Sequence, residues 1–345
     1  LLVKIKTKQG LEGFGIATNY SDINPIIEVF KTDFLEQVIG MDATCPEVIY
    51  EKIFNLTAQK LSFEKKWGKE ALIRISAAID IACWDLIGKA SNFPLYKLFG
   101  GYRNKVPCYV TCAYYRDGKD NKELKDEIEM LLAQGHQGFK GKVGGLSLKE
   151  DIDRMNIVRD VIGDEKSLMI DVNRAWDLKT AIEGANLLKP LNPIWLEEPV
   201  RWSDDRRELK LLSQKTDIPI SGGESELTIY GCRAMLEEQA IQILQFDCTM
   251  FGGFTAGKKL SALCELNHVD IAPHHDCFIH AHIVAGSPSG LIVESFTDPE
   301  RDPLQAELFT NPPKIENGWL YLNDEPGLGL DLSKDALLKF GNKIV

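Results

Sequence analysis

Eight short apolar runs alternate with helical patterns from Val106 onward, and this alternation constrains the fold more than any other feature of the chain. Each run is rich in β-branched or apolar residues, and helical segments of 10 to 16 residues separate the runs. In chain order they are PCYVTCA, GFKGKV, SLMIDV, PIWLEEP, IPISGGE, IQILQFD, VDIAPHH and LIVESF. Eight β–α repeats over about 190 residues predict a closed parallel barrel rather than an open sheet.

The residues on either side of the repeats have a different pattern. Residues 1–18 alternate like a hairpin, and helical periodicity follows at about 24–40, 46–60 and 70–90. After Phe296 the repeats stop, and WLYLND and GLGLDLS have the pattern of a tail that returns to the first unit. We therefore expect an N-terminal α+β domain over 1–105, a barrel over 106–300 and a C-terminal tail over 301–345 that packs against the N-terminal domain.

Charge and cysteine content narrow the class of partner and the cellular compartment. The chain has 40 basic and 51 acidic residues, a net charge of −11, which argues against nucleic acid as a partner because phosphate binding needs clustered Lys and Arg. The 8 cysteines include no Cys-x-x-Cys pair, and we interpret them as reduced core residues. No apolar stretch approaches membrane-spanning length and no signal-peptide pattern opens the chain, so we expect a cytoplasmic protein without membrane contact.

An ionisable side chain stands at the carboxyl end of every predicted strand from the second onward, 20 to 29 residues apart. These residues are Lys142, Asp171, Glu197, Glu224, Asp247, His274 and Glu294. Helix capping could explain one or two such residues, but not seven in succession. Because the carboxyl ends of barrel strands converge on one mouth, we expect these side chains to surround a single site.

Three carboxylates, Asp171, Glu197 and Glu224, come from consecutive strands of this ring. Three anions in a partly buried mouth repel one another by several kcal/mol, roughly, unless a cation neutralises them. A set of oxygen ligands without Cys or His favours a hard divalent ion, and we predict Mg²⁺ ahead of Mn²⁺ or Ca²⁺.

Two lysines, Lys140 and Lys142, lie on the second predicted strand and point to the same face, roughly 7 Å apart. Lysines on a strand are often gatekeepers at an exposed sheet edge, but a closed barrel leaves this strand no edge. A second ammonium group lowers the pKa of a lysine, so we expect Lys140 to tune Lys142 and Lys142 to act as a base.

A histidine and an aspartate stand on the other side of the carboxylate trio. We expect Asp247 to orient the His274 imidazole and to raise its pKa, which gives a second acid–base group facing Lys142. Glu294, if protonated, could donate a hydrogen bond to a substrate carboxylate, and Asn173 is predicted to contact the substrate. We interpret the remaining histidines near this strand end, His275, His280 and His282, as packing or helix residues.

These residues together resemble the enolase superfamily, and within it the mandelate racemase subgroup. The resemblance rests on K-G-K at 140–142, D-V-N at 171–173, L-E-E-P at 196–199, G-G-E at 222–224, Asp247, P-H at 273–274 and Glu294. The segment AAIDIACWDLIGKASNFPLYKLFG, 77–100, also looks like the helix that enters the barrel in this family. The second histidine in PHHD is a departure, since a small residue is common there, and it leaves His274 as the predicted catalytic histidine.

The resemblance implies a modified (β/α)7β TIM barrel under an α+β capping domain formed from both ends of the chain. It also implies Mg²⁺ on Asp171, Glu197 and Glu224, acid–base chemistry by Lys142 and the Asp247–His274 pair, and a homo-oligomer. Substrate selection would lie in capping loops at about 14–24 and 43–68, with Tyr20 as a predicted substrate contact.

Two bases on opposite faces of a small carboxylate substrate permit two reactions. One is dehydration of a sugar acid, with His274 protonating the departing hydroxyl, and this is the reaction we predict because many members of the subgroup resemble acid-sugar dehydratases. The other is racemisation or epimerisation of a 2-hydroxy acid. A barrel that keeps the metal but has no catalytic activity is a third, less favoured alternative.

Overall fold

Eight parallel strands form the centre of the molecule in the computed structural model, which describes all residues from Leu1 to Val345. They are β3 (Lys105–Cys112), β4 (Gly138–Lys142), β5 (Ser167–Asp171), β6 (Leu196–Glu197), β7 (Ile220–Gly222), β8 (Ile243–Leu244), β9 (Asp270–Ile271) and β10 (Val293–Ser295). Strands β3 to β9 pair in chain order, and β10 pairs parallel with β3. A parallel bridge between Ile271 and Gly290, which precedes β10, completes the ring. The predicted closed barrel is confirmed.

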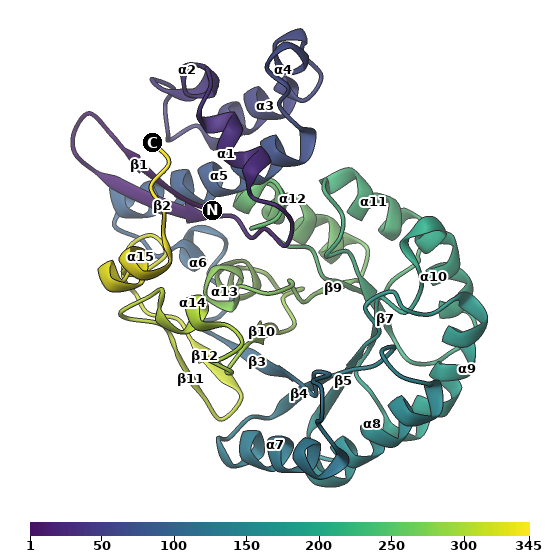
Figure 1. The fold of residues 1–345 in the computed structure, drawn as a ribbon. Helices are drawn as coiled ribbons and strands as arrows, with labels where there is room; N and C mark the ends of the chain where they lie inside the picture. Colours follow the sequence, from purple (N-terminus) through teal and green to yellow (C-terminus); the bar gives the residue numbers. More distant parts are fainter.

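One helix lies between each pair of successive barrel strands and covers the outside of the barrel (Figure 1). The helices are α7 (Asn121–Ala133), α8 (Leu148–Ile162), α9 (Leu178–Leu188), α10 (Asp205–Ser213), α11 (Ile229–Glu237), α12 (Gly253–Leu266) and α13 (Cys277–Gly286). Their order gives seven β–α units followed by a last strand. Two of the longer helices start with side-chain caps, since Asp120 accepts from the backbone of α7 and Ser147 forms a capping box with Glu150 on α8.

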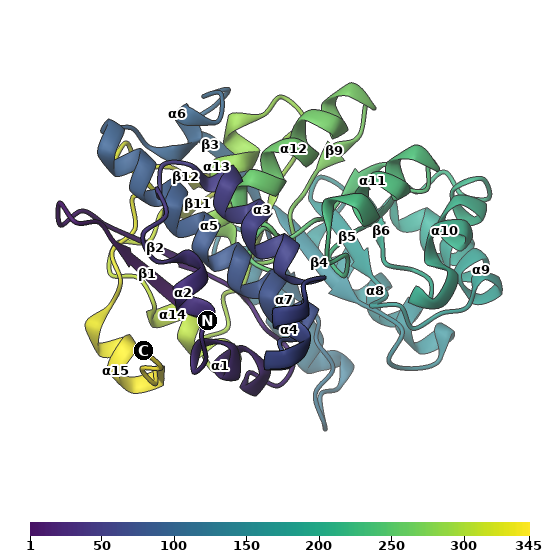
Figure 2. The ribbon, with the colours of Figure 1, turned by 90° about the horizontal axis from the view of Figure 1, so that it is seen from above.

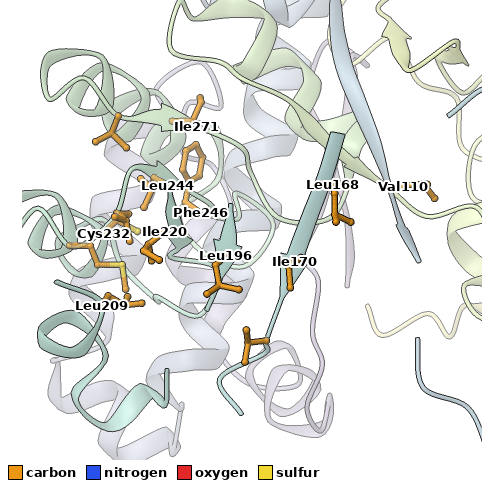
Figure 3. Close-up of a cluster of buried hydrophobic side chains, with 14 of the residues drawn as sticks. Val110, Leu168, Ile170, Leu196, Leu209, Ile220, Cys232, Leu244, Phe246 and Ile271 are labelled. Atoms are coloured by element: carbon orange, nitrogen blue, oxygen red, sulfur yellow. The ribbon is translucent and has the colours of Figure 1, made fainter. Parts of the chain in front are cut away.

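Alternating side chains on each strand separate the outer core from the barrel interior. Leu168 and Ile170 on β5 point outward into a large apolar cluster that also contains residues of the surrounding helices, such as Leu209 (Figure 3). Met169, between them, points inward and packs with Tyr109 and Trp195. This period-two pattern places Asp171, two residues after Met169, on the inner side at the upper end of its strand.

Strand β4 lies inside the sheet, hydrogen-bonded to β3 on one side and to β5 on the other. It therefore has no free edge, and a gatekeeper role for its lysines is excluded. The register pairs Lys142 with Asp171 across β4 and β5, and Asp171 with Glu197 across β5 and β6. Lys140 is one step deeper, opposite Met169.

The N-terminal unit, from β1 to α6, packs beside the barrel, with α5 against α12 and α6 against α13 (Figure 2). It contains the antiparallel hairpin β1 (Leu2–Lys6) and β2 (Glu12–Ile16), then α1 (Asn24–Phe30), α2 (Phe34–Val38), α3 (Pro46–Leu56), α4 (Lys60–Lys65), α5 (Lys69–Ser91) and α6 (Leu95–Leu98). The single helix expected over 24–40 is thus two short helices. Strand β2 lies directly on α5, since an added Cβ at Gly15 would be 2.1 Å from the Ala78 carbonyl oxygen.

The C-terminal segment contacts both parts of the molecule. Strands β11 (Lys314–Glu316) and β12 (Trp319–Tyr321) form a hairpin that extends the barrel sheet, because β12 pairs antiparallel with β3. Between the short helices α14 (Pro303–Glu307) and α15 (Lys334–Phe340), the chain also runs along α5, where Leu328 N–H donates to Asp85 Oδ1 at 2.9 Å. The sequence pattern had indicated only the contact with the N-terminal unit.

Burial and helix length give two further observations. Seven of the cysteines are buried and all eight are free thiols, but Cys45 is exposed and is not a core residue. None of the helices combines the length and the apolar character needed to cross a bilayer.

Candidate active site

Lys142, Asp171 and Glu197 lie side by side at the barrel mouth, the end where the carboxyl ends of the strands meet. The strand register brings them to the same level on three adjacent strands. Lys142 Nζ donates to Asp171 Oδ2 and lies 5.6 Å from the centre of the Tyr114 ring. Its side chain is 14% exposed, whereas that of Asp171 is 1% exposed, so the amine is the accessible member of the pair.

Lys140 is fully buried one step below and is surrounded by carboxylates. Its Nζ lies 2.7 Å from Glu197 Oε1, 2.7 Å from Glu294 Oε1 and 3.7 Å from Asp171 Oδ2. Burial alone would lower the pKa of Lys140, but Glu197 and Glu294 outweigh it and raise that pKa well above the usual range. Lys140 is therefore a compensated cation whose charged contacts are carboxylates, and the tuning of Lys142 by Lys140 stays a prediction.

The two other carboxylates of the trio differ in their hydrogen bonds. Glu197 is fully buried and satisfied, because its Oε2 accepts from Trp195 Nε1 at 2.9 Å and from Gln245 Nε2 at 2.8 Å. Glu224 Oε2 is buried without a hydrogen-bond partner. Burial, together with the negative charges of Glu198 and Glu197, raises the pKa of Glu224 well above its usual range. The site is short of positive charge at Glu224.

The donor set of the trio is suitable for a hard divalent cation, although the side chains do not form a ready cage. No three His, Cys, Asp or Glu side chains are grouped closely enough to enclose a metal ion. Instead, lysine ammonium groups contact Asp171 and Glu197. The oxygen ligands and the unpartnered Glu224 oxygen nevertheless fit such an ion, since a buried carboxylate without a partner is stabilised by a cation.

His274 and Asp247 form a hydrogen-bonded pair on the other side of the trio. His274 Nδ1 lies 3.1 Å from Asp247 Oδ2, and His274 Nε2 points toward Glu224, at 3.7 Å from its Oε2. Burial alone would lower the pKa of His274, but the hydrogen bond to Asp247 and the charge of Glu294 outweigh burial and raise it. His274 follows the carboxyl end of β9, whereas Lys142 is the last residue of β4. Strands β10 and β3 lie between these two strands in the barrel.

Glu294 lies between the lysines and the histidine loop, but it does not have the protonation state suggested for it. It accepts hydrogen bonds from the Thr111 hydroxyl and from His275 N–H, the latter at 2.9 Å. Burial alone would raise the pKa of Glu294, but Lys140 and His274 hold it below its usual range. Glu294 accepts hydrogen bonds here, and its contact with Lys140 favours the carboxylate over the protonated donor that was predicted.

The two predicted substrate contacts lie at the rim of the site. Asn173 is exposed with a left-handed backbone, φ 46°, and its backbone N–H donates to Asp171 Oδ1 at 2.8 Å. Tyr20 is 63% exposed, and its ring stands edge-on to His274 with centroids 6.1 Å apart. Both are free to meet a ligand, but only the backbone of Asn173 is engaged with the trio.

Sequence reasoning missed several side chains that complete the site. Arg174 Nη2 forms an ion pair with Glu198 Oε1 at 2.7 Å. Glu198 is the second glutamate of L-E-E-P and does not belong to the trio. Gln245 holds Glu197, and strand parity could have revealed it because it lies two residues before Asp247 in the segment that continues β8. No sequence signal distinguishes Thr249, whose Oγ1 donates to Asp247 Oδ1 at 2.7 Å.

Besides Tyr20, the N-terminal unit reaches this site through the hydroxyl group of Thr18. Thr18, two residues beyond β2, has its Oγ1 2.9 Å from Thr249 Oγ1 and donates to Asp276 Oδ2 at 2.7 Å. Asp276 in turn lies beside His275, with Oδ2 at 3.2 Å from Nδ1. A short polar chain thus connects the N-terminal unit with Asp247.

Comparisons with known proteins agree with this architecture. Residues 1–100 match the family described as mandelate racemase/muconate lactonizing enzyme, N-terminal domain, and residues 123–336 match the enolase C-terminal domain-like family. An arabinonate dehydratase of Saccharolobus solfataricus is 27% identical over 94% of this chain and 86% of its own length. A 3,6-anhydro-alpha-L-galactonate cycloisomerase of Streptomyces coelicolor is 31% identical over 98% of this chain and 90% of its own.

A solved structure gives the same result for the fold. The crystal structure of a mandelate racemase/muconate lactonizing enzyme from a marine actinobacterium, in complex with magnesium, superposes with a TM-score of 0.90. It is 32% identical, and the match covers 98% of this chain and 93% of that one. The chain therefore belongs to the mandelate racemase and muconate lactonizing enzyme subgroup of the enolase superfamily.

Proposed function

We propose that this protein removes the proton next to the carboxylate of a sugar acid and then eliminates water from it. The observation that carries the proposal is the arrangement of one mouth: an accessible lysine on one side, a hydrogen-bonded histidine–aspartate pair on the other, and three carboxylates between them. Similarity to an arabinonate dehydratase supports the choice of dehydration.

Asp171, Glu197 and Glu224 would hold Mg²⁺, as the magnesium complex of the related actinobacterial protein supports. When bound, the ion acts as a Lewis acid that stabilises negative charge on the substrate carboxylate. The pairing of Lys142 with Asp171 would then be replaced, which frees the amine to face the substrate.

Each of the other residues has a role that follows from its contacts. Lys142 Nζ takes the α-proton, and the electron pair of the broken carbon–hydrogen bond shifts toward the substrate carboxylate. The substrate carbon–oxygen bond at the β-position then breaks, and His274 gives its proton to the departing hydroxyl, so that water leaves. Asp247 keeps His274 Nε2 turned toward the mouth by holding Nδ1. Lys140 neutralises Glu197 and Glu294 below the substrate, and Tyr20 and Asn173 contact it at the rim.

The test is deuterium exchange. A panel of sugar acids and 2-hydroxy acids, with both epimers at the α-carbon, is incubated with the protein and Mg²⁺ in D₂O. The proposal expects at least one acid to lose water, with deuterium entering the product at the β-carbon that carried the departing hydroxyl, since the α-carbon becomes a ketone. Exchange or epimerisation without loss of water would favour a racemase, and no exchange with any acid would support a barrel without catalysis.

The lysine assignment has its own arm in this experiment. In Lys142→Ala, exchange is expected to fall by about 10² or more for one epimer, which is the usual contribution of a general base. Persistent exchange for both epimers would show that Lys142 is not the base.

A further inference from the structure

We propose that His280 is a positioning residue that fixes the geometry of the Asp247–His274 pair, as a neutral ring with its proton on Nδ1. The proposal rests on the proposed function, since it assigns His280 a part in the histidine side of the reaction. Sequence reasoning had placed His280 among packing residues, and its side chain is indeed completely buried in the first turn of α13.

The ring of His280 connects the two loops that carry the pair. Its Nε2 lies 2.9 Å from the backbone N of Cys248, the residue directly after Asp247. Its Nδ1 lies 2.9 Å from the backbone O of His275, the residue directly after His274. A single rigid imidazole therefore sets the distance between the β8 loop and the β9 loop at the points where the two functional side chains leave the backbone.

The partners define the tautomer. A backbone N–H can only donate, so Nε2 accepts from Cys248, and a carbonyl can only accept, so Nδ1–H donates to His275. Asp247 Oδ1 is 3.3 Å from the same Nε2 but already accepts from Thr249 N–H at 2.7 Å and from the Thr249 hydroxyl at 2.7 Å. Asp247 thus accepts an imidazole hydrogen bond from His274 alone.

One force acts against the neutral ring. Burial lowers the pKa of His280, but its contact with Asp247 opposes burial and favours the charged ring. A proton on Nε2, however, would remove the hydrogen bond from Cys248 N–H, which is the shorter of the two contacts. The neutral ring satisfies every donor and acceptor around it, and we take it as the resting state.

The backbone after His274 explains why such a brace is needed. His275 and Asp276 both have left-handed backbones, with φ 58° and 33°. Neither is glycine, and each such residue costs about 1–3 kcal/mol and persists only where surrounding contacts hold it. The bond from His280 Nδ1–H to the His275 carbonyl is one such contact, and it acts directly beside His274.

The experiment compares the two faces of the substrate. His280→Asn and His280→Phe are assayed for deuterium exchange with both α-epimers, and His282→Asn is the control. His282 is a buried histidine of the same helix whose Nε2 contacts Leu328 O at 3.2 Å, away from both loops. We expect exchange on the His274 face to fall about 100-fold in both His280 variants, the loss that a misplacement of about 1 Å produces.

Exchange on the Lys142 face should stay within about threefold of wild type in the same variants, since Lys142 is on a strand that His280 does not touch. An equal fall on both faces, or no fall on either, would overturn the proposal. The same fall on the His274 face in His282→Asn would also overturn it, because the effect would then belong to the helix as a whole.

A second measurement does not depend on activity and covers the case of a variant that fails to fold. Nitrogen-15 NMR of histidine-labelled wild-type protein at pH 7 should show His280 with a protonated Nδ1 and an unprotonated Nε2. A doubly protonated ring would overturn the assignment. If wild type exchanges no acid on either face, the proposed function fails, and the NMR result still decides the state of His280.

Discussion

Glu224 is the carboxylate of the site with the least compensation, because its buried Oε2 has no hydrogen-bond partner and is close to the negative charges of Glu197 and Glu198. We expect Glu224→Gln to have a free energy of unfolding about 1 kcal/mol or more above that of wild type in EDTA, since it removes a buried like charge. Urea unfolding measures this difference. The same variant should lose the stabilisation that wild type gains from Mg²⁺, about 2.7 kcal/mol at a hundredfold excess over Kd.

The control for this prediction is Glu226→Gln, which changes a carboxylate on the same loop outside the trio. It should keep the wild-type increase in Tm on addition of Mg²⁺. A full Mg²⁺ response in Glu224→Gln would remove Glu224 from the proposed ligand set.

Lys140 and Lys142 lie two residues apart on one strand but should differ in their effect on stability. Lys140→Met leaves Glu197 and Glu294 without their buried cation, and breaking such a contact costs about 3–5 kcal/mol. Lys142→Met removes an accessible partner of Asp171, which keeps Lys140 at 3.7 Å, so the loss should be smaller. Urea unfolding in EDTA measures both, and an equal loss would contradict the difference in burial.

At the scale of elements, the packing of β2 on α5 depends on glycine. A Cβ at Gly15 would lie 2.1 Å from Ala78 O and 2.6 Å from Ala82 N, both backbone atoms that cannot turn away. Gly15→Ala should therefore destabilise the protein by about 2 kcal/mol or more, as overpacking does. Gly68→Ala, at a position with no atom within 4 Å of an added Cβ, is the matched control and should change the urea midpoint little.

The elements of the barrel could be predicted from the sequence because side chains on a strand alternate between its two faces. The alternation of Leu168, Met169, Ile170 and Asp171 defines which side chains face the core helices and which face the interior, whatever the neighbouring strand is. The break of the 24–40 helix near Lys31 and the pairing of β12 with β3 could not be predicted in this way, because both depend on contacts between segments that no local pattern encodes.

The same limit applies to the site. Strand-end positions brought Lys142, Asp171, Glu197 and His274 to one mouth from spacing alone. The charge state of Glu294 depends on Lys140 from a strand 150 residues earlier in the chain, roughly, and on burial that only the closed barrel creates. Periodicity specifies a face, whereas protonation depends on the identity of the neighbours across it.

At the scale of the whole molecule, Asp80 connects the N-terminal unit to the barrel. Its Oδ1 accepts from Thr255 N–H, in the first turn of α12, at 3.0 Å, and its buried Oδ2 has no partner. Burial raises the pKa of Asp80 to about 7, against an ordinary value of 3.8, although hydrogen bonds from Thr255 oppose the rise. The junction between the two parts of the molecule therefore titrates near neutral pH.

The direction of the pH effect follows from the raised pKa. Because the folded protein holds this proton more tightly than the unfolded chain, the contribution of Asp80 to stability is complete below pH 3.8 and declines as the pH rises to about 7. Asp80→Asn should remove this decline, a difference on the order of a few kcal/mol between pH 5 and 8. Urea unfolding at four pH values compares the two proteins, and parallel curves would refute the assignment.

The hydroxyl of Thr18 constrains how the loop that carries it can evolve. Tyr20, at the rim, follows two residues later on the same segment, while Thr18 itself touches Thr249 and Asp276 beside the histidine–aspartate pair. A replacement loop that adapts the rim to a new acid would also disturb the polar chain that ends on Asp247. Under the proposed function, selectivity and proton transfer would therefore change together, and a graft of this loop would need to carry its threonine with it.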